Sequence, residues 1–210
     1  MTERTIITRV TNAVLYSDGT IRLDNLRWSY PHVYEPFQGK PDPKTGIKPD
    51  PKFSLIGMLA KGTHVAAKDL LKARIDELMR ENKIPDLAAD KKFLRNGDTS
   101  GKADYKGFWT VSTSEVAKKP PSVRGPNGKK LPKEIGDSLI FGGVYGSLLL
   151  RPWYQNNNWG KRVNAGLVAV QYTKTGEPFG EGRISEDEIE NSFDPVEGED
   201  DWDTGDDEEL

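Results

Sequence analysis

The charge of this chain changes sign near residue 180, and this change limits which part of it can fold. Residues 181–210 contain 15 Asp or Glu and a single Arg, a net charge of −14. Residues 1–180 contain 29 Lys or Arg and 18 Asp or Glu, a net charge of +11. So acidic a segment, with few apolar residues, cannot bury enough surface to offset its ordering entropy. We therefore predict a folded basic domain over residues 1–180 and an acidic tail over 181–210 that is disordered when free.

The amino-acid composition limits the fold class of residues 1–180. The 21 Gly and 14 Pro of the chain favour a loop-rich β protein over a helical bundle. The absence of cysteine excludes disulfides and thiolate metal sites. No apolar run approaches the ~20 residues of a membrane span, and the N-terminal segment lacks the apolar stretch of a signal peptide. We expect a soluble cytoplasmic protein with no membrane partner.

Apolar and β-branched stretches predict strands at 5–16, 20–28, 53–60, 108–113, 144–154 and 163–173, with a turn at 17–19. About five strands, one helix and long loops fit a mainly β fold, a five-stranded barrel of the OB type. A β-sandwich is the alternative.

One helix is predicted from 64 to about 82, with Thr63 as its N-cap and Pro85 after its end. Its apolar residues recur at helical spacing and are expected to pack on the core. They are Ala67, Leu70, Leu71, Ile75, Leu78 and Met79. Five prolines in 30–51 argue against long regular structure there. We predict a loop at 116–133 and a tight exposed turn at 155–161.

The usual sequence signatures of catalysis are missing. His32 and His64 do not have metal-ligand spacing, and no P-loop, dinucleotide fingerprint or nucleophile elbow occurs. We therefore predict a protein that is not an enzyme and that has no catalytic residue, metal or cofactor.

Aromatic and basic residues instead occur together, as single-strand binding requires, because bases stack on rings and phosphates contact cations. One cluster surrounds the connector of the last two predicted strands and contains Arg151, Trp153, Tyr154, Trp159, Lys161 and Arg162. A second precedes and enters the strand at 108–113 and contains Lys102, Tyr105, Lys106 and Trp109. Further cations in the Pro/Gly-rich loop are Lys118, Lys119, Arg124, Lys129 and Lys130. We predict that all of these contact nucleic acid.

Several of these residues have a structural alternative. Because side chains alternate along a strand, one of Trp153 and Tyr154 is expected to face the core. Phe108 and Trp109 are also adjacent in a predicted strand, so one of these two is likewise expected to face the core. Trp159 lies in a turn, so we expect its ring to be exposed. The loop lysines have the alternative of being ordinary solubilising charges.

Four segments of the chain carry a resemblance to a known family. They are WSYPHVYEPF at 28–37 with KFSL at 52–55, and YQNNNWGKRVNAGL at 154–167 with GEPFGEGR at 176–183. Together they resemble a phage family, long catalogued as a domain of unknown function, that is now grouped with single-stranded DNA-binding proteins. The resemblance covers roughly residues 22–183. The segment GEDDWD at 198–203 also resembles the tails of phage replication-type single-stranded DNA-binding proteins.

The resemblance implies an OB-fold that coats single-stranded DNA during phage replication and recombination in an infected bacterium. It also implies a tail that shields the DNA cleft and contacts phage or host replication proteins. The tail residues concerned are Trp202, Asp206, Asp207, Glu208, Glu209 and Leu210. Related tails commonly end in an aromatic residue, whereas this chain ends in Leu210, so docking through a terminal ring is not supported.

We therefore predict a protein that binds single-stranded DNA with weak sequence preference, because every base offers a π-face. Its tail is expected to compete with DNA for the groove. One alternative is a strand-annealing recombination mediator. Another is an interaction hub, in which the tail binds other proteins and the body is a scaffold. The sequence does not fix the oligomeric state, and a homodimer is possible.

Overall fold

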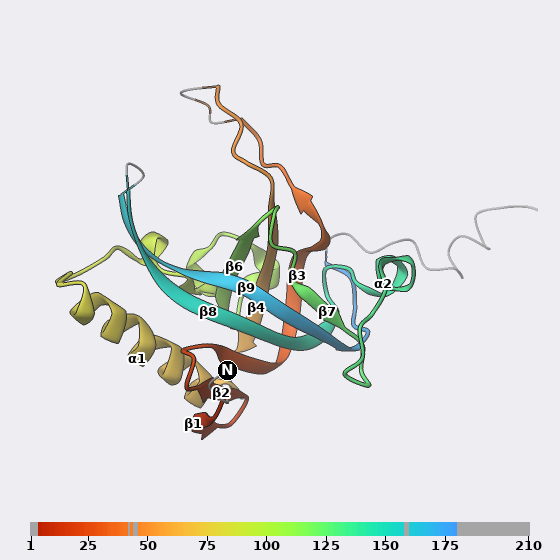
Figure 1. The fold of residues 1–210 in the computed structure, drawn as a ribbon, viewed down its shortest axis with the longest axis horizontal. Helices are drawn as coiled ribbons and strands as arrows, with labels where there is room; N and C mark the ends of the chain where they lie inside the picture. Colours follow the sequence, from red (N-terminus) through yellow and green to blue (C-terminus); the bar gives the residue numbers. More distant parts are fainter. Residues whose placement is uncertain (1–3, 42, 44–45, 158–159, 180–210) are drawn as a thin grey trace, which may run out of the picture. The chain divides into compact units, whose positions relative to one another are not determined.

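Five long strands close into a barrel in the computed structural model, which describes residues 4–41, 43, 46–157 and 160–179 (Figure 1). In chain order they are β3 (Ile21–Phe37), β4 (Lys52–Ala60), β6 (Phe108–Val116), β8 (Tyr145–Asn157) and β9 (Gly160–Lys174). β3 pairs antiparallel with β4 and β8, β4 with β6, and β8 with β9. A parallel bridge between Ser114 of β6 and Gly166 of β9 completes the ring. The predicted five-stranded OB-fold is confirmed.

Four shorter strands extend this sheet. β1 (Ile6–Val10) and β2 (Ala13–Tyr16) continue it beyond β3, β5 (Leu94–Asn96) pairs with β6, and β7 (Ser122–Arg124) runs parallel to β9. The segment 5–16, predicted as one strand, therefore forms two. Asn12 reverses the chain between them with φ 61°, a left-handed conformation that Asn tolerates.

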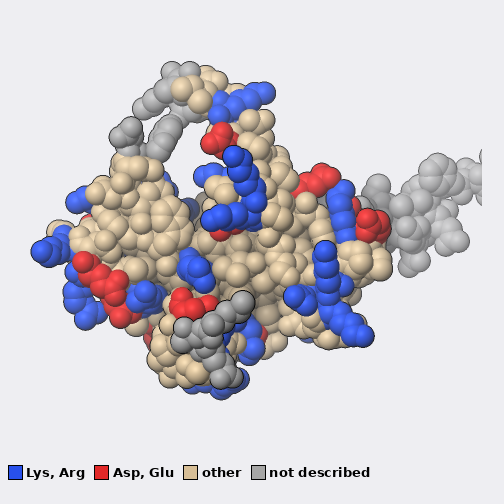
Figure 2. Space-filling model, in the orientation of Figure 1, with Lys and Arg blue, Asp and Glu red and all other residues tan. Residues whose placement is uncertain are grey.

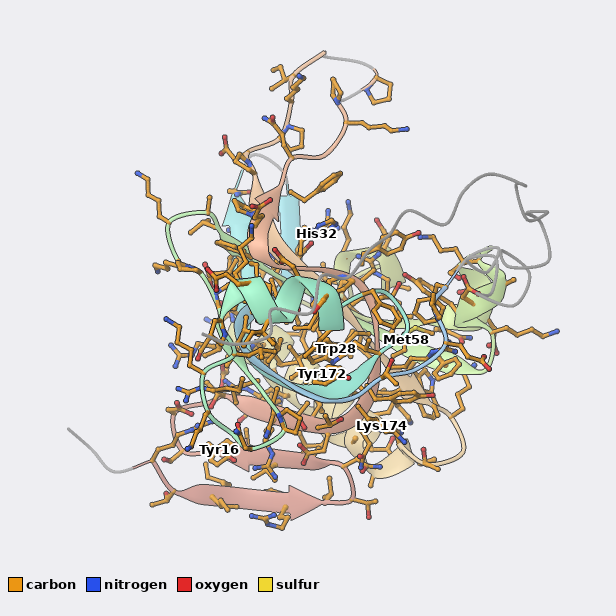
Figure 3. The ribbon with its side chains drawn as sticks, turned by 90° about the vertical axis from the view of Figure 1, so that its right-hand side faces the viewer. Tyr16, Trp28, His32, Met58, Tyr172 and Lys174 are labelled. Atoms are coloured by element: carbon orange, nitrogen blue, oxygen red, sulfur yellow. The ribbon has the colours of Figure 1, made fainter. Side chains whose placement is uncertain are left out.

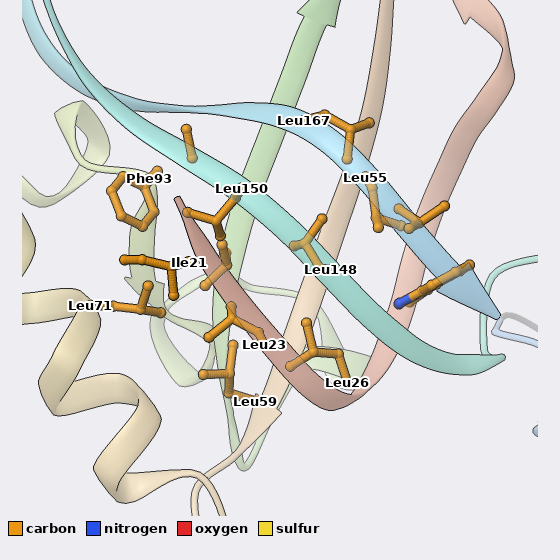
Figure 4. Packing of buried hydrophobic residues seen from close by; sticks show 14 of the residues in the cluster. Ile21, Leu23, Leu26, Leu55, Leu59, Leu71, Phe93, Leu148, Leu150 and Leu167 are labelled. Atoms are coloured by element: carbon orange, nitrogen blue, oxygen red, sulfur yellow. The ribbon is translucent and has the colours of Figure 1, made fainter. Parts of the chain in front are cut away.

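Alternation along the strands gives the barrel an inner and an outer face. Leu148 and Leu150 of β8 and Leu55 of β4 face inward and are fully buried (Figure 4). Trp28 of β3 is also fully buried (Figure 3). Gly146 allows the strand to lie against this indole, since a Cβ at that position would be 2.3 Å from a Trp28 ring atom.

The helix α1 (Val65–Glu81) packs against the barrel through the predicted apolar stripe. Its buried residues are Ala67, Leu71, Ile75, Leu78 and Met79, and Leu70 is partly buried against the same core. The predicted N-cap is wrong: His64 occupies that position, and no side chain caps the helix. The hydroxyl of Thr63 lies 2.8 Å from Nδ1 of His64, so it is directed at the ring rather than at the first turn. The helix ends before Pro85, as predicted.

Two arms project from the same side of the barrel (Figure 1). The first arm is the far end of β3 with the loop 38–51. β3 extends further into this proline-rich segment than predicted, through Pro31 and Pro36. The β3–β4 register shifts between Ser29 and Phe37. Both prolines therefore fall where the ladder is irregular and a missing N–H costs little.

The second arm is the β8–β9 hairpin. Its pairing continues to Asn157 opposite Gly160, so most of the predicted turn at 155–161 is strand. The polar side chains of Gln155 and Asn156 are compatible with a two-stranded ribbon there.

A second helix, α2 (Lys133–Leu139), follows the segment 116–133 that was predicted as a loop, and β7 lies within that segment. Tyr34 of β3 donates a hydrogen bond of 2.9 Å from its hydroxyl to the Leu131 carbonyl. Burial, together with nearby carboxylates of α2, raises the pKa of Tyr34 to about 12, which keeps this donor protonated. Across the described ranges, no helix has both the length and the apolar character needed to cross a membrane.

Replacing Leu148 with Ala should lower the free energy of unfolding by about 2–5 kcal/mol, because the side chain is fully buried and its loss leaves a cavity. Ile7→Ala is the matched control. That side chain is 62% exposed, and its loss should change stability by less than about 0.5 kcal/mol. Urea unfolding followed by tryptophan fluorescence measures both. A small effect of L148A would contradict the packing described above.

Candidate nucleic-acid interface

In OB-folds, oligonucleotides bind the outer face of the second and third barrel strands, between the loops that join strands one to two and four to five. In this chain those strands are β4 and β6, and those loops belong to the two arms. Cross-strand pairing places Ser54 opposite Ser114 and Ile56 opposite Ser112. Leu55 between them is buried, so these four side chains point outward. Figure 2 shows a hollow between the arms, with Lys and Arg side chains beside it.

The segment 91–95 fills a gap between β6 and β9. The Phe93 N–H donates to the Val163 carbonyl of β9 at 3.0 Å, and the Ser112 N–H of β6 donates to the Phe93 carbonyl at 2.9 Å. The Phe93 ring is 2% exposed and belongs to the core. Burial of this ring therefore anchors a basic segment between two barrel strands.

The anchored segment and the two strands form a groove of about 130 Å³, here called the basic groove. Its lining residues are Lys91, Lys92, Phe93, Arg95, Ser112, Thr113, Ser114, Arg162, Asn164 and Ala165. Four of them are cations, and the serine hydroxyls and the asparagine amide add hydrogen-bond donors.

The two arginines of the basic groove are oriented by one backbone oxygen. Nη2 of Arg95 and Nη2 of Arg162 donate to the Asp90 carbonyl, at 3.1 and 2.9 Å. Nε of Arg95 also donates to the Lys92 carbonyl at 3.1 Å. Among the residues that the structure describes, no carboxylate lies within 4.0 Å of either guanidinium. Two oriented, unneutralised guanidinium groups that leave other N–H donors free suit a phosphate.

The lysines of the groove differ from the arginines, because each has a carboxylate nearby. Nζ of Lys91 lies 3.5 Å from Asp90, and Nζ of Lys92 lies 3.7 Å from Asp86. The Asp86 side chain is 89% exposed. Such exposed pairs are weak, so both lysines can still contribute to the positive field of the groove.

Trp153 is the exposed aromatic residue beside the basic groove. It pairs with Asn164 across β8 and β9, and 43% of its surface is exposed. Its neighbour Tyr154 pairs with the buried Val163 and packs against the core. The alternation predicted for these two residues is thus resolved with Trp153 outward and Tyr154 inward.

The other predicted hairpin residues are spread along the second arm. Arg151 and Lys161 are exposed, and Arg151 lies 3.6 Å from the Asp18 carboxylate. Arg162 lies in the basic groove itself. Trp159 and the tail residues Trp202, Asp206, Asp207, Glu208, Glu209 and Leu210 lie outside the described residues.

Two aromatic rings of the second predicted cluster are not on the outer face. Trp109 pairs with the buried Leu59, packs against the core, and has the ammonium of Lys68 5.3 Å from its ring centroid. Tyr105 is 6% exposed, and its hydroxyl lies 3.0 Å from that of Ser29. Tyr105 is thus a buried residue, and Trp109 is partly buried against the core. Lys102 and Lys106 of this cluster are exposed.

Of the predicted loop cations, Arg124 lies away from the basic groove. Arg124 pairs with Gln171, toward the opposite end of β9 from Arg162, and its Nη1 donates to the Gly128 carbonyl at 3.2 Å. The loop lysines are exposed: Lys118, Lys119, Lys129 and Lys130. The register of β7 on β9 therefore separates Arg124 from Arg162.

Three cations of the basic groove were not predicted: Lys91, Lys92 and Arg95. The only signal in the sequence is the basic pattern around Phe93, which looks like ordinary solubilising charge until the ring is seen to be buried. No group of three or more His, Cys, Asp or Glu in the described part of the chain is placed to hold a metal ion.

Comparison with known proteins agrees with the family resemblance seen in the sequence. A family model described as Enterobacter phage Enc34, ssDNA-binding protein matches residues 19–203. The single-stranded DNA-binding protein from bacteriophage Enc34 is 32% identical over 90% of this chain and 99% of that chain, with a TM-score of 0.74. No match was found among curated proteins.

Two further structures of the bacteriophage Enc34 single-stranded DNA-binding protein also have a TM-score of 0.74. Its C-terminal truncation is 33% identical over 85% of this chain and 99% of that chain. Its complex with ssDNA is 32% identical over 86% of this chain and all of that chain. The family resemblance of the sequence is confirmed: this chain belongs to the Enc34 family of phage single-stranded DNA-binding proteins.

Proposed function

We propose that this chain binds single-stranded DNA without strong sequence preference, through the basic groove and the β8–β9 hairpin. The observation that carries the proposal is the pair of unneutralised guanidinium groups of Arg95 and Arg162 on the OB binding face. Family membership supports it, since a relative of 32% identity has been solved in complex with ssDNA.

In the proposed mechanism, the phosphates lie in the basic groove and the bases face the second arm. Arg95 and Arg162 contact phosphates, with Lys91 and Lys92 adding to the positive field. Bases stack on Trp153, whose ring is exposed beside the groove. Weak sequence preference follows because stacking and phosphate contacts do not read base edges.

Further residues extend the proposed path along the second arm. Arg151 and Lys161 are exposed there and are suited to phosphate contacts, and Trp159 is proposed as a second stacking ring. In this role the protein coats single strands during phage replication and recombination.

The acidic tail is proposed to compete with DNA and to contact replication proteins. The segment just before it is fixed on the barrel: the Phe179 N–H donates to the Gly142 carbonyl at 2.9 Å. Nη2 of Arg27 donates to the Glu177 carbonyl at 2.7 Å, and its guanidinium lies 4.2 Å from the Phe179 ring centroid. A tail tethered at a fixed point has a high effective concentration, up to roughly millimolar.

The double variant Arg95→Ala, Arg162→Ala should bind fluorescent oligo-dT about 10- to 100-fold more weakly at low salt, because two phosphate contacts are lost. The slope of log affinity against log salt should fall by about 1.4, at about 0.7 per contact. Fluorescence anisotropy over a salt series measures both quantities.

Lys72→Ala is the matched control for this experiment, because Lys72 is exposed on α1 and pairs with Asp76 at 2.8 Å. Its binding should stay within about 2-fold of the parent. Lys129→Ala, Lys130→Ala tests the loop cations separately. Unchanged affinity and slope in the arginine variant would place the DNA elsewhere, and a parent that does not bind oligo-dT would contradict the function itself.

Removing residues 181–210 should tighten binding to oligo-dT, and the gain should be largest at low salt, because the competing polyanion is gone. The same anisotropy assay compares the full chain with the shortened one. Weaker or unchanged binding of the shortened chain at low salt would contradict competition by the tail.

A further inference from the structure

Tyr30 has a backbone conformation that its sequence context disfavours. Its φ is 49°, in the left-handed region that bulky residues avoid, and it precedes Pro31, which favours extended backbone instead. The other described non-glycine residues with positive φ are two asparagines and a lysine at a helix end. A strained conformation persists where the surrounding structure imposes it, and such positions concentrate at functional sites.

The strained conformation leaves an aromatic ring on the surface. Tyr30 is 55% exposed, although its neighbour Ser29 is buried. The hydroxyls of Ser29 and the buried Tyr105 lie 3.0 Å apart, which ties this part of β3 to the 3-10 helix η3 (Ala103–Tyr105). The ring is therefore displayed from a firmly packed base.

A cation accompanies the exposed ring. Nζ of Lys102 donates to the Tyr30 hydroxyl at 3.1 Å and lies 4.3 Å from the ring centroid. This hydrogen bond raises the pKa of Lys102, which is a full cation at neutral pH. Among the described residues, no carboxylate lies within 4.0 Å of its ammonium. A ring beside an unneutralised cation matches a nucleotide, which presents a base and a phosphate.

The residue before Tyr30 lies in the same cross-strand row as a residue of the basic groove. Ser112 lines the groove and pairs with Ile56 of β4, which in turn pairs with Ser29 of β3. Two interstrand spacings, roughly 10 Å, therefore separate the groove from the residue that precedes Tyr30.

We propose that Tyr30 and Lys102 form a second nucleotide subsite, in which a base stacks on the Tyr30 ring and Lys102 contacts a neighbouring phosphate. The bound strand then crosses β6, β4 and β3 instead of ending at the basic groove. This inference rests on the proposed function, which it extends to a residue outside the two predicted aromatic and basic clusters.

The test compares a fluorescent dT strand with a strand of equal length made only of abasic sites, both bound to the full chain. Tyr30→Ala should weaken dT binding roughly 5- to 150-fold, the range for losing one stacked base, and change abasic binding by less than about 2-fold. Tyr30→Phe keeps the ring and should stay within about 3-fold for dT. Lys102→Ala should weaken both strands alike and lower the salt slope by about 0.7.

Two further variants separate this effect from folding and from general surface changes. Tyr30→Gly removes the ring and also relieves the strain, because glycine accepts positive φ freely. It should lose dT affinity as Tyr30→Ala does, without loss of thermal stability. Tyr16→Ala removes a comparable tyrosine, over which the Arg4 guanidinium lies 3.5 Å from the ring centroid, and should bind dT like the parent. Tyr16 lies far from His32 of the first arm (Figure 3).

The outcomes distinguish the subsite from the function it rests on. The subsite is overturned if both Tyr30→Ala and Tyr30→Gly bind dT like the parent while the arginine variant of the groove loses affinity. It is also overturned if both Tyr30 variants lose dT and abasic binding equally. A parent that does not bind dT would instead overturn the proposed function.

Discussion

The meeting of β6 and β9 is the constraint on which the interface depends. These strands close the barrel, but among the described residues they are bridged directly only at Ser114 and Gly166. The segment 91–95 completes the hydrogen bonding on one side of this bridge, and β7 continues along β9 on the other. Because the gap is filled by a segment with one buried ring and several cations, closing the core also creates the basic groove.

The electrostatics of the groove explain why it suits a polyanion. Backbone carbonyls rather than carboxylates orient the guanidinium groups of Arg95 and Arg162. A carbonyl fixes direction without cancelling charge, so two like charges stay close together in the folded state. Their repulsion costs stability, and the phosphate that we propose to bind there would reduce that cost.

Part of the fold and of the candidate interface could be predicted from the sequence. Alternation and helical spacing located the barrel strands and the buried side of α1, because both are local consequences of backbone geometry. The sequence also drew attention to Trp153 and Arg162, because the hairpin residues are neighbours in the chain; the structure leaves Trp153 exposed and places Arg162 in the basic groove. Tyr105 was predicted to contact nucleic acid, and Trp109 was left between the core and the surface, since composition does not say which way a side chain points. Lys91, Lys92 and Arg95 were missed because their neighbours in space come from distant strands.

The sequence by itself determined the charge split at residue 180 and the β class of the body, and it gave a first set of candidate residues for base stacking and phosphate contact. These follow from composition and short-range periodicity. Only the tertiary structure decided which of those residues share a surface. Barrel closure joins segments more than fifty residues apart, such as Arg95 and Arg162 on one carbonyl oxygen, and it turns Tyr105 and Trp109 into packing residues while displaying Tyr30. The physical reason is that side chains are buried and backbone groups are hydrogen-bonded by partners from all around the barrel. The local sequence pattern does not say which distant strands will pair.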